Sequence, residues 1–300
     1  MPHMIDKFLQ YSRYERNQSP ATVEAYGRDL RQFASFLTHG AEELQPASVT
    51  ASDVRAWLLD LSRHGDGART MRRKVQAVRA LYRWLERRGE VQADPTAYLE
   101  LARLPKPLPH YMRESTMNEL LDAPVDTGDY EAVRDRLMVM MLYETGLRRA
   151  ELIGLRDAAV DTAHGEMRVH GKRDKDRIVP IGPELCAAID AYRRLRDKQV
   201  ARGCDEFFLT ARGKAIYPSL VYRVVHRSLQ QAGGTGKMSP HVLRHTFASA
   251  MLNGGADIDS VKQLLGHESL AATQVYTHIT FSELINNYKQ AHPRALKKGG

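Results

Sequence analysis

Near its carboxyl end the chain reads SPHVLRH over Ser239–His245, then LGH over Leu265–His267 and VYTH over Val275–His278. Each run lies beside a signal for a helix boundary, because proline favours the first turn of a helix and glycine favours its end. The runs together supply imidazoles, a guanidinium and a phenol, which can move protons, neutralise an anion and act as a nucleophile. The histidines have neither the spacing nor the cysteine partners of a zinc site.

His241 and Arg244 lie three residues apart at the start of a helix that is predicted to end near Asn253. A helix amino terminus attracts anions, so an arginine in the first turn does not stabilise the helix, and a bound phosphate explains it better. The neighbouring His245 is expected to face elsewhere, as a core residue. Tyr276 falls in the last turn of a later predicted helix, a place that by itself is typical of half-buried packing.

The run Thr145–Leu152 reads TGLRRAEL and follows an apolar helix predicted over Arg134–Glu144. Gly146 can end that helix in a left-handed conformation, and the next helix then begins at once. Arg148 and Glu151 share a face of this next helix. Their spacing fits a surface ion pair worth about 0.2–0.5 kcal/mol, and it equally fits an arginine that its own glutamate aims at a phosphate.

Two strands, Met167–His170 and Arg177–Ile181, are predicted to form a hairpin around the turn Gly171–Asp176. Lys172 lies on this turn. Turn lysines are usually only solvated, but a lysine on a hairpin can also reach a DNA backbone and donate a proton. Phe207–Leu209 is expected to form a third short strand.

The amino-terminal part of the chain is expected to be helical throughout, with helix starts at Ser19–Pro20 and near Thr50 or Ser52. A third helix, over Arg69–Arg88, has one apolar and one basic face, and Gly65–Arg88 holds eight Lys/Arg against two acids. Such a face is either solvated or lies along a DNA groove and neutralises phosphates, and the shortage of carboxylates favours DNA. The cations expected to bind DNA are Arg69, Arg72, Arg73, Lys74, Arg79 and Arg83.

Length and composition suit two domains of an ordinary cytosolic protein. The chain has 300 residues and a formal net charge of +8, which suits an anionic partner, with nucleic acid favoured over a membrane. No membrane insertion and no signal peptide are expected, and the two cysteines read as reduced thiols. The domains are placed at 1–90, all helical, and 111–300, mixed, with a proline-rich linker over 91–110 between them.

Taken in order along the chain, TGLRRAEL, HVLRH, LGH and VYTH resemble the motifs of the tyrosine recombinase (phage integrase) family. The helical first part is similar to that family's SAM-like core-binding domain, and the ending His292–Ala295 is similar to its Xer branch. The resemblance implies a mainly α fold with a small β-sheet or hairpin. An all-helical core-binding domain and a mixed α/β catalytic domain would form a clamp around DNA.

The resemblance also implies a chemical role for each motif residue. Tyr276 would attack the scissile phosphate, which leaves a 3′-phosphotyrosyl link and a free 5′-hydroxyl. Arg148 and Arg244 would hold the non-bridging oxygens and stabilise the charged transition state. Glu151 would orient the region of Arg148.

Lys172 would protonate the leaving 5′ oxygen, His241 would assist proton transfer from the tyrosine, and His267 would hydrogen-bond the phosphate. The 5′-hydroxyl of a partner strand would then attack the phosphotyrosine, so no metal, ATP or other cofactor is implied. This chain departs from the family at one point of the hairpin, where the common Gly-Lys-Gly is Gly171-Lys172-Arg173.

The implied partner is a double-stranded DNA recombination site, held by four protomers on two duplexes. The leading interpretation is the resolution of chromosome dimers at a site near the replication terminus. Whether a second related recombinase subunit or a DNA translocase takes part stays open. So does whether the last helix, about Phe281–Gln290, packs in its own protomer or on a neighbour, although the resemblance favours the neighbour. Alternatives are a mobile-element integrase with the same chemistry, a type IB topoisomerase, and a DNA-binding protein that has lost the chemistry.

Overall fold

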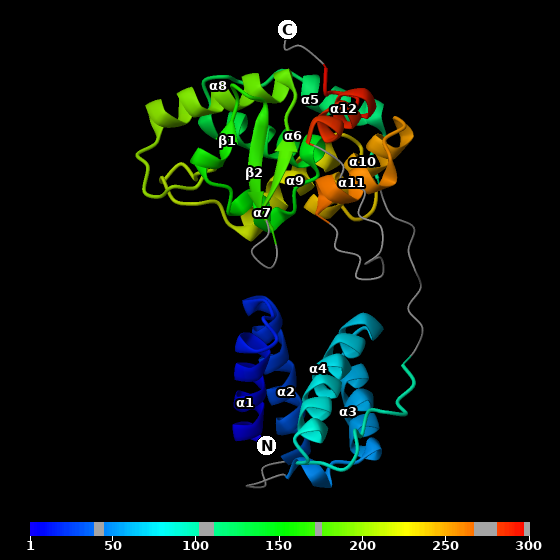
Figure 1. Cartoon of the computed structure of the whole chain (residues 1–300). Helices are drawn as coiled ribbons and strands as arrows, with labels where there is room; N and C mark the ends of the chain where they lie inside the picture. The colour runs from blue at the N-terminus through cyan, green and yellow to red at the C-terminus, as the bar shows by residue number, and fades with distance from the viewer. Residues whose placement is uncertain (39–44, 102–110, 172–175, 267–280, 297–300) are drawn as a thin grey trace. The chain divides into compact units, whose positions relative to one another are not determined.

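The computed structural model describes residues 1–38, 45–101, 111–171, 176–266 and 281–296. The chain divides into two compact units, Met1–Pro107 and Leu108–Gly300 (Figure 1). The described residues are mainly helical and contain one small antiparallel sheet, which confirms the predicted fold class.

The first unit is a bundle of helices around one apolar core. Two predicted helix starts are confirmed by their caps. The Ser19 hydroxyl accepts a hydrogen bond from the Thr22 N–H at 3.2 Å, and Thr50 forms a capping box with Asp53. The predicted basic helix is confirmed as well, within one residue at each end. The helices are α1 (Pro2–Tyr14), α2 (Pro20–Thr38), α3 (Ala51–Arg63) and α4 (Ala68–Arg87).

The second unit is built around a central helix, α6, which is buried along most of its length and packs against α7, α8, α9 and α10 (Figure 1). Its elements are α5 (Glu114–Asp122), α6 (Tyr130–Thr145), α7 (Arg149–Ile153), β1 (Val160–Asp161), β2 (Glu166–His170), β3 (Asp176–Pro180), α8 (Pro183–Gln199), α9 (Pro218–Gln231), α10 (Pro240–Asn253), α11 (Ile258–Leu265) and α12 (Phe281–Ala291).

The sheet has the order β1-β2-β3, and all its strands are antiparallel. The predicted hairpin is confirmed as β2 and β3, with Met167 opposite Val179. The prediction of a strand at Phe207–Leu209 is wrong, because β1 is the third strand and residues near 207 make only isolated bridges. The two phenylalanines there are fully buried and pack against Tyr192, so their hydrophobicity reflects the core and not a sheet.

The last helix, α12, packs on α10, α11 and β3 of its own chain. Its buried residues Tyr288 and Ala291 join an apolar cluster with Phe247, Met251 and Leu264. The resemblance favoured docking of this helix on a neighbouring protomer, and this stays a prediction, while in the single chain Tyr288 and Ala291 are buried. The junction is tight, because a Cβ on Gly254 would lie 2.1 Å from the Ala291 carbonyl oxygen.

Candidate active site

The buried arginine of α10, Arg244, joins the ends of two other helices. Its side chain donates hydrogen bonds from Nη1 to the carbonyl oxygen of Gly146 and from Nη2 to that of Leu265, both at 2.6 Å. Gly146 ends α6 and Leu265 is the last residue of α11. A guanidinium in the first turns of α10 therefore ties together the two segments that carry the TGLRRAEL and LGH motifs.

Both of the helices that carry those segments end at a glycine in the left-handed conformation, which the sequence predicted for Gly146. Gly146 has φ +62°, and Gly266 after α11 also has φ +62°. At Gly146 the lack of a side chain matters twice, because a Cβ would also lie 2.5 Å from the ring of Phe247. Close packing of α6 on α10 is what brings the Gly146 carbonyl to Arg244.

The second motif arginine, Arg148, is held by the glutamate three residues ahead. Its Nη1 donates to Glu151 Oε1 at 2.7 Å, and its backbone N–H donates to Oε2 at 2.8 Å. Its Nη2 donates to the carbonyl oxygen of Gly266 at 2.8 Å. Of the two interpretations of this pair, a simple surface pair does not fit, because Glu151 is only 5% exposed and Arg148 reaches α11.

A third arginine, Arg177 on β3, belongs to this cluster and was missed by sequence reasoning. It donates from both terminal nitrogens to Glu151, at 2.9 and 2.8 Å, and from Nε to the Leu264 carbonyl oxygen at 2.8 Å. The sequence held only a weak signal for it: Arg177 is the first residue of the predicted strand RIVPI, whose other residues are apolar.

The cluster formed by Arg148, Arg177, Arg244 and Glu151 is electropositive. Burial acts to raise the pKa of Glu151, but hydrogen bonds from Arg177 and Arg148 and the charge of Arg177 outweigh it, so the pKa is lowered and the carboxylate is ionised. Burial lowers the pKa of Arg244 to about 10, with repulsion from Arg148 and Arg177 adding to the effect. Arg244 still keeps its charge at neutral pH. Three positive charges thus face one negative charge, which favours an anion at this place.

The two histidines of α10 lie together. The rings of His241 and His245 meet edge to face, with centroids 4.5 Å apart. The expectation that His245 faces away is wrong with respect to His241, because residues four apart share a helix face. Burial lowers the pKa of His241, and electrostatic repulsion from its neighbours, among them Arg244 and Lys237, lowers it further, so the ring is neutral and can accept a proton at pH 7.

Three of the predicted catalytic residues, Lys172, His267 and Tyr276, lie outside the described residues. The segment that contains Lys172 lies between the described strands β2 and β3 in the sequence, and the segment that contains His267 begins after α11. Arg244 and Arg148 bond the carbonyls of Leu265 and Gly266, the two residues that immediately precede His267. Within the described ranges, no group of three His, Cys, Asp or Glu side chains is placed to hold a metal ion. In the same ranges, no helix has the length and apolar character needed to cross a membrane.

The six predicted DNA-binding cations of the first unit differ in their surroundings. Lys74 is 7% exposed and pairs with Asp66 at 2.6 Å, and Arg73 pairs with the buried Asp29 of α2. These two cations have carboxylate partners inside the unit, which the sequence count did not reveal.

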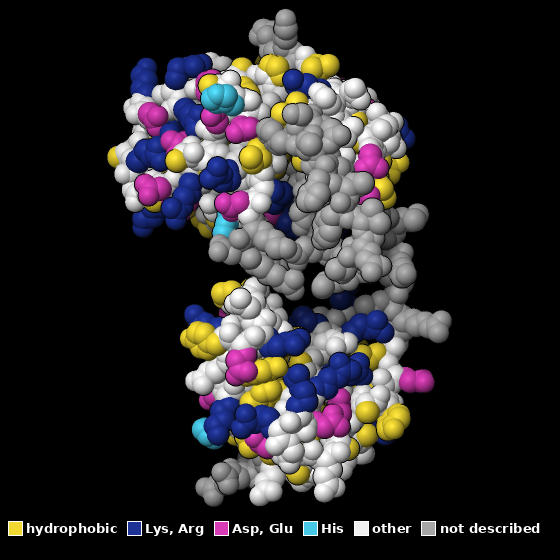
Figure 2. All heavy atoms as spheres, in the orientation of Figure 1, with side chains coloured by type: hydrophobic (Ala, Val, Ile, Leu, Met, Phe, Trp, Pro, Cys, Tyr) yellow, Lys and Arg dark blue, Asp and Glu magenta, His cyan; other side chains and the backbone are white. Residues whose placement is uncertain are grey.

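Arg79 donates to the Thr96 carbonyl oxygen at 2.9 Å, and Arg72 to that of Leu101 at 3.4 Å. Arg69 and Arg83 are exposed. On the visible face of this unit, Lys and Arg side chains are numerous and only a few Asp and Glu side chains lie among them (Figure 2).

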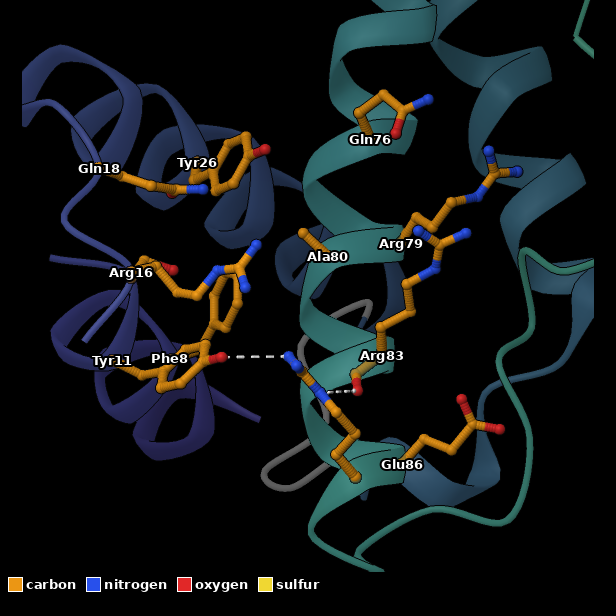
Figure 3. Close-up of a pocket in the computed structure, with 12 residues that line it drawn as sticks. Phe8, Tyr11, Arg16, Gln18, Tyr26, Gln76, Arg79, Ala80, Arg83 and Glu86 are labelled. Atoms are coloured by element: carbon orange, nitrogen blue, oxygen red, sulfur yellow. Dashed lines mark hydrogen bonds between the residues drawn. The ribbon is translucent and has the colours of Figure 1, made fainter. Parts of the chain in front are cut away.

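A groove of about 590 Å³ opens beside Arg83. Figure 3 shows Tyr11, Arg16 and Tyr26 on the side of α1 and α2, facing Ala80 and Arg83 on α4. Arg16 is a cation that the sequence reasoning did not single out, because it follows α1 in a stretch with no pattern of its own. The groove combines aromatic rings with guanidinium groups on both walls.

Comparison with known proteins agrees with the motifs. The Phage integrase family matches residues 110–283, which contain all six predicted catalytic residues, and the Phage integrase, N-terminal SAM-like domain matches residues 5–89. The tyrosine recombinase XerC of Chlorobaculum tepidum is 38% identical, over 97% of this chain and 94% of its own. XerC of Oceanobacillus iheyensis is also 38% identical, over 97% of this chain and 96% of its own.

Among solved structures, the XerH site-specific recombinase bound to palindromic difH substrate has a TM-score of 0.70 at 19% identity, covering 95% of this chain and 84% of its own. The Tn1549 transposon integrase in complex with transposon right end DNA has a TM-score of 0.71 at 18% identity, covering 95% and 98%. These two similarities concern the fold. The family matches and the XerC relatives decide the assignment: this chain belongs to the phage integrase family and is a tyrosine recombinase, an enzyme of site-specific DNA recombination that breaks and rejoins DNA strands.

Proposed function

We propose that Arg148 and Arg244 bind the scissile phosphate of a DNA recombination site and that Tyr276 attacks it. The observation that carries this proposal is the packing of three guanidinium groups around one carboxylate, because that excess of charge suits a phosphodiester anion. Arginine has five N–H donors. Arg244 uses two nitrogens on carbonyl oxygens and Arg148 uses two on Glu151 and Gly266, so each keeps donors for the phosphate oxygens.

The proposed reaction is a transesterification that conserves the number of phosphoester bonds. The Tyr276 oxygen forms a bond to phosphorus, and the bond from phosphorus to the 5′ oxygen breaks. His241, whose lowered pKa leaves it neutral, helps to remove the phenol proton, and Lys172 gives a proton to the 5′ oxygen. His267 donates a hydrogen bond to the phosphate. A 5′-hydroxyl of the partner strand then reverses the step on a new strand.

DNA binding by the first unit is proposed to use the cations that have no carboxylate partner among the described residues. Arg69 and Arg83 are exposed on α4, and Arg16 and Arg83 lie on opposite walls of the groove in Figure 3. Arg73 and Lys74 act instead through their ion pairs with Asp29 and Asp66 to hold the bundle together. This assignment narrows the set of phosphate contacts that the sequence predicted.

A matched pair of variants tests this division of roles. Arg83→Gln should weaken DNA binding uniformly across sequences and lower the slope of log K against log salt by about 1, since each phosphate contact releases roughly one counterion. Arg73→Gln should leave that slope unchanged and lower the thermal stability of the first unit. Equal salt slopes for wild type and Arg83→Gln would remove Arg83 from the interface.

For the biological role, we propose resolution of chromosome dimers at a site near the replication terminus. The support is the similarity to XerC proteins at 38% identity over nearly the whole chain, against 18% for the transposon integrase. The active assembly is proposed to be a tetramer on two duplexes, with a related second recombinase subunit and a DNA translocase as candidate partners. A mobile-element integrase is the rival, since the Tn1549 integrase has the same fold.

A suicide-substrate assay tests the proposed chemistry and the proposed site together. The protein is incubated without added metal on nicked DNA that carries the terminus-proximal site of its host, and a denaturing gel is read for a covalent protein–DNA band. The band should be lost in Tyr276→Phe and kept in Tyr98→Phe, which alters a 94% exposed tyrosine of the first unit. A band that survives Tyr276→Phe refutes the nucleophile. A band formed only on the ends of a mobile element refutes the chromosomal role.

A further inference from the structure

Arg177 fastens the first residues of β3 to two other elements at once. Its two terminal nitrogens form a two-pronged contact with the Glu151 carboxylate on α7, and its Nε bonds the Leu264 carbonyl at the end of α11. Its side chain is only 13% exposed. Such a planar two-pronged contact fixes direction as well as charge, which a lysine cannot do.

Glu151 is shared between Arg177 and Arg148. Its Oε1 accepts from Arg148 Nη1 at 2.7 Å and from Arg177 Nη1 at 2.9 Å. Its Oε2 accepts from the Arg148 backbone N–H and from Arg177 Nη2, both at 2.8 Å. The orientation of Arg148 thus depends on a carboxylate whose own orientation is set from the far side by Arg177.

Gly266 is a second residue that lies against Arg177 and also bonds Arg148. The carbonyl of Gly266 accepts from Arg148 Nη2, and a Cβ on Gly266 would lie 3.2 Å from Arg177 Nη1. The last turn of α11 therefore lies directly against the Arg177 guanidinium. Arg177 therefore bonds one described acceptor of the Arg148 side chain, Glu151, and lies against the residue that supplies the other, Gly266.

We propose that Arg177 is a positioning residue for Arg148: it fixes Glu151 and the end of α11 so that the Arg148 guanidinium points its remaining donors at the scissile phosphate. This inference rests on the proposed function of Arg148. Arg177 does not touch the phosphate in this scheme. Its loss leaves a buried carboxylate with a single guanidinium partner and lets Arg148 turn toward it.

The test is a double-mutant cycle on the rate of covalent adduct formation in a single turnover, with the suicide DNA saturated by protein. The variants are Arg177→Gln, Glu151→Gln and the double variant. We expect Arg177→Gln to be about 10- to 100-fold slower than wild type, the scale of a 1 Å misplacement of a catalytic group, with DNA affinity changed less than about threefold. Because both residues act through one contact, the double variant should be no slower than the slower single variant.

A matched control separates positioning from the general loss of an internal arginine. Arg193 on α8 also bonds the carboxylate of Asp157 and two carbonyl oxygens, lies 4.0 Å from the Asp190 carboxylate, and has a side chain that is 23% exposed. Arg193→Gln should keep the wild-type adduct rate. Arg177→Lys keeps the charge but loses the two-pronged contact, so the variant should fold and still form the adduct slowly. This variant carries the test if Arg177→Gln does not fold.

The possible outcomes decide between the two levels of proposal. A wild-type rate in Arg177→Lys, an equal rate in Arg177→Gln and Arg193→Gln, or multiplied losses in the double variant would each overturn the positioning role alone. If the wild-type protein forms no Tyr276-dependent adduct, the proposed function fails, and the role of Arg177 in it fails with it.

Discussion

Replacement of Arg294 by methionine should remove a large electrostatic contribution to the stability of the second unit. Arg294 follows α12 and is 1% exposed. It donates to Asp122 of α5 at 2.8 Å, to Glu144 of α6 at 3.2 Å, and to Glu184 of α8. The chain end beyond α12 is thereby tied to three helices of the core by one guanidinium.

The magnitude follows from burial. Glu144 is 0% exposed, so loss of Arg294 leaves a carboxylate inside the protein without its cation. Removal of one partner from a buried pair typically costs about 3–5 kcal/mol. For a unit of this size each kcal/mol lowers Tm by roughly 2–4 °C, so a drop of about 6–20 °C is expected. Arg227→Met is the matched control: Arg227 pairs with Asp135 at 2.7 Å but is 64% exposed, so its loss should cost at most about 1 kcal/mol.

Two spectroscopic signals separate the two units in this assay. Both tryptophans, Trp57 and Trp84, lie in the first unit, so tryptophan fluorescence reports the unfolding of that unit, while far-ultraviolet circular dichroism reports both. Arg294→Met should shift the transition seen only by circular dichroism and leave the fluorescence transition in place. If Arg294→Met costs no more than Arg227→Met, the reasoning from buried charge is refuted.

Three further predictions concern other parts of the second unit. Gly146→Ala combines a left-handed φ with a Cβ 2.5 Å from Phe247 and should lower the free energy of unfolding in urea by about 2–5 kcal/mol. Gly233→Ala, with a similar φ and open space around its Cβ, should lower it by only about 1–2 kcal/mol. Equal losses in the two variants would contradict the packing argument. Burial, with repulsion from Arg294, lowers the pKa of His292 to about 3, so between about pH 6.5 and 3 the unfolded chain binds a proton that the folded chain does not. The free energy of unfolding should therefore fall as the pH drops through this range, and His292→Phe should remove about 2 kcal/mol of that fall at pH 5. An unchanged pH dependence in His292→Phe would show that His292 does not contribute. Lys172→Ala should slow adduct formation by about 10²- to 10⁴-fold on ordinary DNA. The defect should be far smaller on DNA with sulfur at the 5′ bridging position, because a thiol with a pKa near 8.5 leaves without a proton. Equal defects on both substrates would refute Lys172 as the proton donor.

Local patterns in the sequence were enough to predict several features that depend on residues three or four apart. The left-handed end at Gly146, the helix start near Thr50 and the basic helix α4 are of this kind, and each is confirmed. Such features form from neighbouring backbone groups and side chains, whatever the rest of the chain does. The order of the motif residues also sufficed to predict the family.

The contacts that give those residues their surroundings join positions far apart in the chain, and no local pattern predicts them. Arg177 meets Glu151 across 26 residues, Arg73 meets Asp29 across 44, and Arg294 meets Glu144 across 150. An arginine in a strand, on a basic helix or near a chain end looks solvated in sequence, since its partner is absent from its neighbourhood. The sequence by itself therefore determined the family and where several helices begin and end, and it predicted which groups perform the chemistry. Only the tertiary structure decided which arginines gather around Glu151 and which are held by other buried carboxylates, because burial and charge pairing depend on how the elements pack.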